Sequence, residues 1–349
     1  MDTIKPTKIG RNFNDRLTSA EIGKLWATYM GNSMSTCILS YFLQHVEDSE
    51  IKKLVEHALS LSEEFQSMIK EIFTNEHIPI PHGFTKEDVN LEAPKLFEDE
   101  FYVHYLKYVA KAGMSIYNVA VPLMYREDVR NFYLYCMDAT MKLIEQIKSI
   151  LMNKGMIIKP PIIPIPEDVK TACPDYLKGL IGKVRPLHAL EITHLYDNIE
   201  NNVTSRALIM AFRQVAKREK VREVFKKGED LTTRAVERYM AKLHDDHLPA
   251  PSFLDHLVTT SIISPFSDKL MLFHKVDMFS MKIRAFGNSV AVNGRHDLAV
   301  LYGKSLTNIF KFVDDASHLM IKNGWMEVPP EAADRKNLAL KEKPTHGQN

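Results

Sequence analysis

His77-Ile-Pro-Ile-Pro81 recurs in the second half of the chain as His247-Leu-Pro-Ala-Pro251, and the similarity extends on both sides of this stretch. Upstream, the shift that carries His77 onto His247 also places a series of residues on their counterparts: Glu21, Leu25, Asn32, Ser35, Phe42 and Leu61 on Glu191, Leu195, Asn202, Ser205, Phe212 and Leu231. Downstream, a shift shorter by one position aligns a second series: Phe97-x-Asp99, Arg126-x-Asp128 and Gly155 with Phe266-x-Asp268, Arg295-x-Asp297 and Gly324. The chain is therefore an internal duplication with a single-residue indel near position 83.

Each copy is expected to contain four helices, because apolar residues keep a 3.6-residue period through four segments. The predicted segments of the first copy are 18–46, 51–75, 96–121 and 127–153. Those of the second copy begin near 188, 219, 265 and 296, and the last ends near 323. Thr18-x-x-Glu21 is a capping-box pattern, Pro122 interrupts the third helix, and Gly155 has the position of a C-terminal cap.

The connection between the second and third helices is long, at roughly twenty residues, and its alternating prolines favour an extended backbone. Twenty extended residues reach about 60 Å, whereas a helix of this length spans about 40 Å. An end-to-end crossover is therefore possible, and it would make the second and third helices parallel, as in ferritin-like bundles. The alternative is an all-antiparallel bundle with an ordered surface loop, and we favour the crossover because long loops are uncommon in compact domains.

The predicted fold class is thus all-α, with two tandem ferritin-like four-helix bundles. The expected bundles span 17–158 and 188–328, joined by a proline-rich linker at 159–187 and followed by a polar tail at 329–349. The residues before 17 and the tail are polar, and we expect both to lack fixed structure.

Composition excludes several classes of protein. Lys+Arg 45 against Asp+Glu 44 is nearly neutral, which argues against bulk electrostatic binding to nucleic acid. No apolar run approaches membrane-spanning length and no signal core is present, so we expect neither membrane insertion nor export, and a cytoplasmic location. Three scattered cysteines indicate reduced thiols rather than a disulfide framework.

The paired Asn and Ser, the His-x-Pro-x-Pro crossover, Arg-x-Asp before the fourth helix and the Gly followed by Pro-Pro after it together resemble a family. It is a domain-of-unknown-function family of spore-forming bacilli, and the resemblance covers roughly residues 17 to 330. Members look like ferritin-like four-helix bundles, often in tandem, and some carry a spore coat label by similarity to coat protein F. The resemblance implies this fold and an association with the spore.

Asn32 with Ser35, and their counterparts Asn202 with Ser205, place polar side chains on the core face of the first helix of each copy. A buried polar group without a partner costs roughly 1–3 kcal/mol. One interpretation is that these side chains satisfy each other and a facing helix, which fixes the register of the bundle. The other is a small polar pocket in the bundle centre, where ferritin-like proteins place ligands.

A second candidate site is a metal centre confined to the second copy. Glu191-x-x-His194 and Asp315-x-x-His318 have the carboxylate and imidazole spacing of dimetal bundles, and Fe or Mn would be the metal. In the first copy Lys24 and Lys148 stand where the histidines would be required. Outside this alternative we expect no cofactor.

The remaining recurrent residues have structural interpretations. His77 and His247 are expected to hydrogen-bond backbone carbonyls and fix the crossover, and the two Arg-x-Asp motifs to cap the fourth helices. The aromatic residues Phe101, Tyr102, Tyr105 and Tyr108 spread too widely around the third helix for one core stripe, so some of them are expected to pack the two bundles together.

No strong catalytic signature is present, so the leading hypothesis is a non-enzymatic structural or interaction protein, with protein partners or self-association and an association with the spore implied by the resemblance. The first alternative is a ferritin-like metal-binding protein or oxidoreductase with its site in the second bundle. The second is a small-molecule-binding bundle centred on Asn32 and Asn202, which requires a cavity beside those residues.

Overall fold

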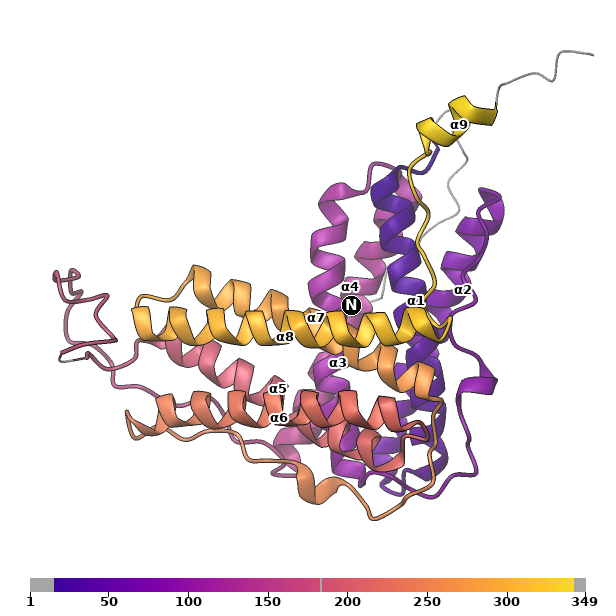
Figure 1. Ribbon diagram of the computed structural model, residues 1–349. Helices are drawn as coiled ribbons and strands as arrows, with labels where there is room; N and C mark the ends of the chain where they lie inside the picture. The colour runs from indigo at the N-terminus through magenta and orange to yellow at the C-terminus, as the bar shows by residue number, and fades with distance from the viewer. Residues whose placement is uncertain (1–15, 183, 342–349) are drawn as a thin grey trace, which may run out of the picture.

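The computed structural model describes residues 16–182 and 184–341, so most of the segment before 17 and the end of the tail lie outside the described residues. Within these ranges every regular element is a helix (Figure 1). The first repeat contains α1 (Ser19–His45), α2 (Ser49–Asn75), η1 (Lys86–Asp88), α3 (Asp99–Ala120), η2 (Val121–Leu123) and α4 (Glu127–Asn153). The second contains α5 (Ala189–Val215), α6 (Glu219–His244), η3 (Asp255–Leu257), α7 (Asp268–Ala291) and α8 (His296–Lys322), and α9 (Arg335–Lys341) follows.

Local sequence sets where the helices begin and end. Thr18 forms the predicted capping box: its hydroxyl accepts the Glu21 N–H, and the Glu21 carboxylate accepts the Thr18 N–H at 2.7 Å. His188 takes the same position before α5 and accepts the N–H of Glu191 through Nδ1. Helix α3 ends where Pro122 enters a short 3₁₀ turn. None of the described helices combines the length and the apolar character that a membrane-spanning segment needs.

The crossover makes α2 and α3 parallel, as predicted. Asp99, the first residue of α3, accepts the backbone N–H groups of Glu47 and Asp48 in the joint between α1 and α2, at 2.8 and 2.7 Å. Helix α3 therefore starts at the end of the bundle where α2 starts, and residues 76–98 must span the length of the bundle. Asp268 of α7 caps the joint between α5 and α6 in the same way, through Lys217 and Arg218. The role of both aspartates is thus to tie the crossover to the adjacent helix joint.

His77 and His247 act through their backbone. Their φ angles are +54° and +58°, in the left-handed region, and each ends a helix at the position that glycine usually occupies. Ile78 N–H closes the cap of α2 by donating to Phe73 O at 2.9 Å. Among the described residues neither imidazole has a hydrogen-bond partner, so the expectation that these rings fix the crossover by binding a carbonyl is wrong.

Replacing His247 with glycine is expected to raise the free energy of unfolding by about 1 kcal/mol, because a left-handed backbone costs a non-glycine residue about that much. Urea unfolding followed by circular dichroism measures the change. The neighbouring His244→Gly variant, in the last turn of α6, is the control and should lose about 1 kcal/mol. A loss of stability in His247→Gly as large as that of His244→Gly would show that the imidazole makes an important contact.

The two bundles are crossed in Figure 1, and their crossover segments meet in a pseudo-two-fold joint. Val89 pairs with Phe266, and Phe97 pairs with Val258, each as an isolated antiparallel bridge. The shift that aligns the downstream parts of the repeats converts Val89 into Val258 and Phe97 into Phe266. Each bridge is therefore the symmetry mate of the other.

Backbone hydrogen bonds across the joint obey the same symmetry. Asn90 N–H donates to Pro265 O at 2.7 Å, and its mate is Thr259 N–H to Leu96 O at 3.0 Å. A second such pair consists of Glu98 N–H to Leu257 O and Ser267 N–H to Asp88 O, both 2.9 Å. The paired atoms interchange when the repeats interchange, which is the geometry of an isologous two-fold interface.

Tyr105 and His274 are themselves related by this downstream shift, so their contact lies on the pseudo-two-fold axis. The Tyr105 hydroxyl and His274 Nε2 share a buried hydrogen bond of 2.7 Å. Burial and the adjacent Lys275 charge lower the pKa of His274 to about 3, so the ring is neutral at neutral pH. Tyr108 also crosses the joint, donating to Met278 O at 2.8 Å. The prediction that part of the α3 aromatic group packs the bundles together is confirmed.

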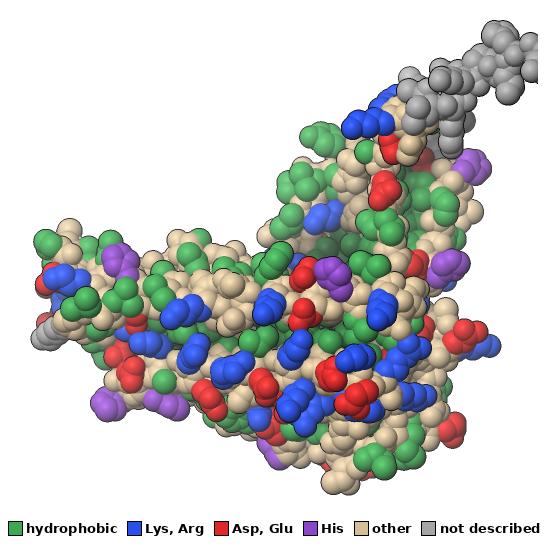
Figure 2. All heavy atoms as spheres, viewed as in Figure 1, with side chains coloured by type: hydrophobic (Ala, Val, Ile, Leu, Met, Phe, Trp, Pro, Cys, Tyr) green, Lys and Arg blue, Asp and Glu red, His purple; other side chains and the backbone are tan. Residues whose placement is uncertain are grey.

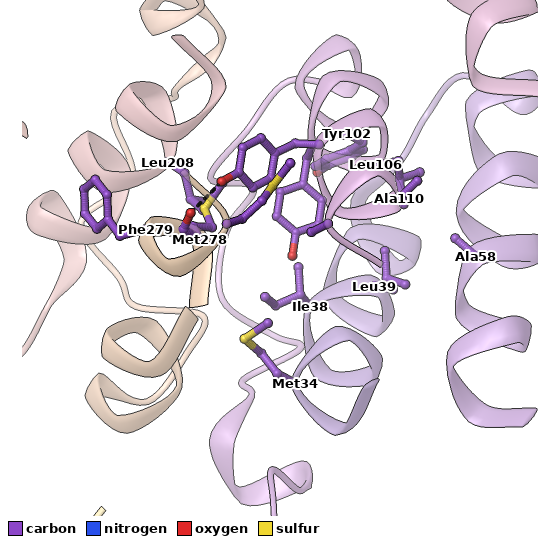
Figure 3. Close-up of a cluster of buried hydrophobic side chains, with 14 of the residues drawn as sticks. Met34, Ile38, Leu39, Ala58, Tyr102, Leu106, Ala110, Leu208, Met278 and Phe279 are labelled. Atoms are coloured by element: carbon purple, nitrogen blue, oxygen red, sulfur yellow. Dashed lines mark hydrogen bonds between the residues drawn. The ribbon is translucent and has the colours of Figure 1, made fainter. Parts of the chain in front are cut away.

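One hydrophobic cluster runs through both repeats. Figure 3 shows Leu208, Met278 and Phe279 of the second bundle in the same group as Tyr102 and Leu106 of the first. The two bundles thus share a core and are not connected by the proline-rich linker alone.

The C-terminal segment returns to the first bundle after α8 (Figure 1). The Glu327 carboxylate accepts the backbone N–H groups of His82 and Gly83 at 2.9 and 2.7 Å. Beyond it, Asp334 caps the short helix α9 by accepting the N–H groups of Lys336 and Asn337. The expectation that the whole tail at 329–349 lacks structure is therefore wrong for 335–341, which form α9.

Candidate functional site

Glu191 is a structural capping residue in the second bundle. Its side chain is fully buried at the start of α5 and accepts two hydrogen bonds from Arg185, at 2.8 and 2.9 Å. It also accepts the backbone N–H groups of Gly294 and Arg295, each at 3.1 Å, which closes the joint between α7 and α8. Burial opposes ionisation, but the bonds from Arg185 and from the His188 backbone outweigh it and lower the pKa of Glu191.

The structure does not bring the four metal-ligand candidates together. His194 is half-buried one turn after Glu191, and burial lowers its pKa. Asp315 pairs with Lys227 at 3.1 Å, and the exposed His318 pairs with Asp314. Asp315 lies roughly five helical turns along α8 from the end that Glu191 caps. The local Glu-x-x-His spacing suggested ligands, but Glu191 is committed to the helix joint.

More generally, no group of three or more His, Cys, Asp or Glu side chains in the described part of the chain could hold a metal ion. The metal-binding alternative therefore has no set of ligands among these residues.

Asn32 and Ser35 border a cavity of about 120 Å³ between the first bundle and α7. Asn32 does not bond to Ser35: its amide donates to Thr28 O, four residues earlier on the same helix, at 2.8 Å. The opposite wall of this cavity includes His274 and Asp277 of the second repeat. The first-bundle pair therefore lies beside a space that both repeats line.

Asn202 and Ser205 occupy a different environment in the second bundle, where both are buried. Asn202 donates to Asn198 O at 2.7 Å. Ser205 is bound from the facing helix, because Lys275 Nζ donates to its hydroxyl at 2.7 Å and to its carbonyl at 3.0 Å. Ser205 thus has a charged partner, whereas the position of Lys275 is occupied by Leu106 in the first repeat.

Lys275 and Lys282 are the functional candidates that the sequence reasoning missed. They are 0% and 1% exposed on α7, and neither forms an ion pair with any described residue. Both ammonium groups lie over the Phe279 ring, with Lys275 Nζ 5.1 Å and Lys282 Nζ 4.3 Å from its centroid. Burial lowers the pKa of both lysines well below the usual value, and the charge of Lys275 adds to the effect at Lys282.

A signal for these lysines exists in the sequence. Met271, Lys275, Met278 and Lys282 keep the spacing of a core stripe, and the first repeat has Leu106 and Gly113 where the two lysines stand. A lysine normally lies at the surface with its aliphatic stem along apolar groups. The charge of Lys275 and Lys282 therefore argued against assigning these positions to the core.

A cavity of about 250 Å³ lies in the second bundle, and its lining includes Thr232 and Phe279, the two residues that Lys282 Nζ contacts, but neither lysine itself. Its floor includes the buried side chains of Asn202, Thr232 and Phe279, and Lys282 Nζ makes a long contact of 3.5 Å with the Thr232 hydroxyl. Arg234 and Arg238, both exposed on α6, line its mouth. Figure 2 shows Lys and Arg side chains over α6 and α8, with Asp and Glu side chains among them.

Comparison with known proteins places the chain in a family. The sequence pattern of a family described as a protein of unknown function (DUF3231) matches residues 9–169 and again 176–338. The chain belongs to the DUF3231 family. It contains two tandem DUF3231 repeats, which agrees with the duplication read from the sequence.

Among solved structures, the chain is similar to one from Bacillus halodurans described as a "putative spore coat protein". The two are 18% identical with a TM-score of 0.40, and the match covers 44% of this chain and 98% of that one. No curated protein matches the chain.

Proposed function

We propose that this DUF3231 protein is a non-catalytic structural or interaction protein in which the two repeats act as one preassembled pair. The observation that carries the proposal is the pseudo-two-fold joint between the crossover segments, with its symmetric backbone hydrogen bonds. Isologous interfaces of this kind usually join two identical chains. Here a single chain supplies both sides, so the pair forms without dependence on concentration.

The shared core supports a fixed arrangement of the pair. Domains with small polar contacts move relative to one another, whereas a large apolar interface suppresses that motion. The joint here is apolar and carries ion pairs at its edge, where Lys107 pairs with Glu200 and Lys111 with Asp197. A fixed pair presents the outer faces of both bundles in one orientation.

Exposed apolar side chains support contacts with other proteins. Ile162 and Ile165 of the proline-rich linker are 96% and 92% exposed. Phe310 and Ile321 are 68% and 61% exposed on α8, and their spacing of three helical turns places them on one face. Exposed apolar groups arranged along one face are typical of interaction surfaces.

The spore is the proposed site of action, and the sequence resemblance to spore coat-like proteins supports it. A fluorescent fusion of the full chain, followed through sporulation in a spore-forming host, tests this location. Enrichment at the developing spore and recovery in the coat fraction is the expected result. Uniform fluorescence in the mother cell and absence from purified spores would contradict the proposal.

Cleavage of the linker is expected to leave the two repeats associated. Lys170 lies in an exposed stretch, so brief trypsin treatment should cut there without disturbing either bundle. Size-exclusion chromatography should then show both fragments co-eluting at the size of the intact chain, because the joint and not the linker holds them.

Two variants distinguish a loss of affinity between the repeats from a general loss of stability. Tyr105→Phe removes the hydroxyl on the pseudo-two-fold axis and leaves His274 Nε2 unpaired, which should cost about 1–3 kcal/mol at the joint. Tyr239→Phe removes a hydroxyl that bonds Ser305 within the second bundle, and is the matched control. Nicked Tyr105→Phe should dissociate more readily in dilute urea than nicked Tyr239→Phe. Fragments of the wild type that separate in buffer alone would refute the preassembled pair.

A further inference from the structure

The second bundle holds two buried lysines, Lys275 and Lys282, whose charges have no acidic partner among the described residues. An ammonium group removed from water is strongly destabilised unless an anion or good hydrogen bonds replace the lost hydration. Lys275 has two hydrogen bonds to Ser205. Among the described residues, Lys282 has a single hydrogen-bond contact, 3.5 Å from the Thr232 hydroxyl, although an ammonium group can donate three hydrogen bonds. Lys282 is therefore the less satisfied of the two.

The cavity next to Lys282 has a cationic mouth. Arg234 and Arg238 are four residues apart on α6, so they project from the same side of the helix. Neither has an ion pair or a hydrogen bond with another residue in the described ranges. The described residues that line the cavity include no aspartate or glutamate. Like charges that remain unpaired around one opening raise the local concentration of anions.

The first repeat provides an internal comparison. The positions equivalent to the four cationic residues Lys275, Lys282, Arg234 and Arg238 are occupied there by Leu106, Gly113, Glu64 and Met68. The fold of the repeat therefore does not require these charges, because the same four-helix plan forms without them. They are a feature of the second bundle alone.

We propose that the cavity between α6 and α8 binds a small oxyanion, a molecule that carries a carboxylate or a phosphate group. The Thr232 hydroxyl accepts from Lys282 and can donate its own hydrogen to the anion, which links the buried ammonium to the ligand. Arg234 and Arg238 supply charge-assisted hydrogen bonds from the mouth. This site lies apart from the pseudo-two-fold joint that carries the proposed structural role.

The size of the cavity limits the ligand. A volume of about 250 Å³ corresponds to roughly eight water molecules at liquid density. This is close to the lower end of small-molecule pockets, so the ligand is an inorganic oxyanion or a small metabolite and not a polymer. Asn202, at the buried end, offers an amide that can orient the rest of a small organic ligand.

Calorimetric titration of the full chain tests the proposal. Sodium phosphate and sodium succinate are the two probes, each at constant ionic strength, so that their responses separate phosphate from carboxylate recognition. We expect saturable heat with at least one probe. The surface double variant Arg234→Gln/Arg238→Gln should weaken that binding roughly tenfold or more. A hydrogen bond from a charged group contributes about 1.5–3 kcal/mol, and about 1.4 kcal/mol corresponds to a tenfold change in affinity.

Two further variants keep the test decisive. Lys282→Met should weaken saturable binding while the chain stays folded, because Lys282 acts on the ligand through the Thr232 hydroxyl. Lys226→Gln/Lys311→Gln removes the same number of positive charges from exposed positions on α6 and α8 that do not line the cavity, and should bind as the wild type does. Equal affinities for the two double variants, or no saturable heat with either probe, would overturn the proposal.

Discussion

Replacing Glu191 with alanine is expected to lower the free energy of unfolding by about 3–5 kcal/mol, since it leaves a largely buried guanidinium without its counter-charge. Two Arg185 nitrogens lose their acceptors, and the N–H groups of Gly294 and Arg295 lose theirs at the joint between α7 and α8. Urea unfolding at neutral pH measures the loss. This single carboxylate holds together three parts of the second repeat: the linker, the start of α5 and the start of α8.

The pH dependence gives an independent check on the same residue. Because the pKa of Glu191 is lowered in the folded state, its contribution is complete above the ordinary value of 4.5 and is lost as pH falls through the lower folded-state value. Glu191→Gln keeps the shape and removes the charge, so its stability should fall less steeply in acid than that of the wild type. Identical acid profiles for the two proteins would show that the Arg185 pair contributes nothing.

Replacing Lys282 with methionine is expected to have the opposite sign and to raise the free energy of unfolding of the ligand-free chain by about 1–4 kcal/mol. Methionine fills a similar volume beside Phe279, and it removes a buried cation with one weak hydrogen bond. Thermal and urea unfolding measure the gain, and exposed Lys304→Met on α8 serves as the control, with a change near zero.

The sign of the pH effect follows from the lowered pKa of Lys282. The unfolded chain holds the proton up to the usual lysine pKa, whereas the folded chain releases it at lower pH. Folding is therefore favoured as pH rises between these two values, and Lys282→Met should have a shallower rise in stability over that range. A destabilised Lys282→Met variant would mean that the ammonium group is needed for the fold itself and not for a ligand.

The two variants together distinguish structural charges from functional ones. Glu191 and Arg185 satisfy each other in the folded chain, so removing one partner costs stability. Lys282 has no such partner among the described residues, so removing it should stabilise the empty protein and weaken anion binding. Residues that reduce stability without an evident compensation are often those retained for function.

Helix positions and repeat symmetry were predictable from the sequence because they depend on local chemistry. Thr18 and Glu21 are three residues apart and cap α1 wherever the helix packs. The prolines after His77 exclude helix, and the length of that connection permitted the crossover that makes α2 and α3 parallel. The duplication was likewise recognisable from the order of residues alone, because shifting the sequence by two fixed offsets aligns its two halves.

Partners from distant parts of the chain could not be predicted in this way. Glu191-x-x-His194 has the spacing of metal ligands, but the carboxylate binds Arg185 and the joint before α8, which is far from Glu191 in the sequence. The left-handed backbone of His77 and His247 was also hidden, since the imidazole suggested a side-chain role.

From the order of its residues alone, this protein is recognisable as a duplicated helical module with capped helices and a long crossover, because those features follow from neighbouring residues and from periodicity. The roles of its charged and polar residues became visible only once the chain was folded. The fold places Lys275 and Lys282 in the core, Asn202 beside a cavity, and Tyr105 against its own repeat mate His274. The physical reason is that burial and pairing depend on which surfaces meet in the folded chain. The sequence identifies a residue as lysine but does not show whether its ammonium group faces water or Phe279.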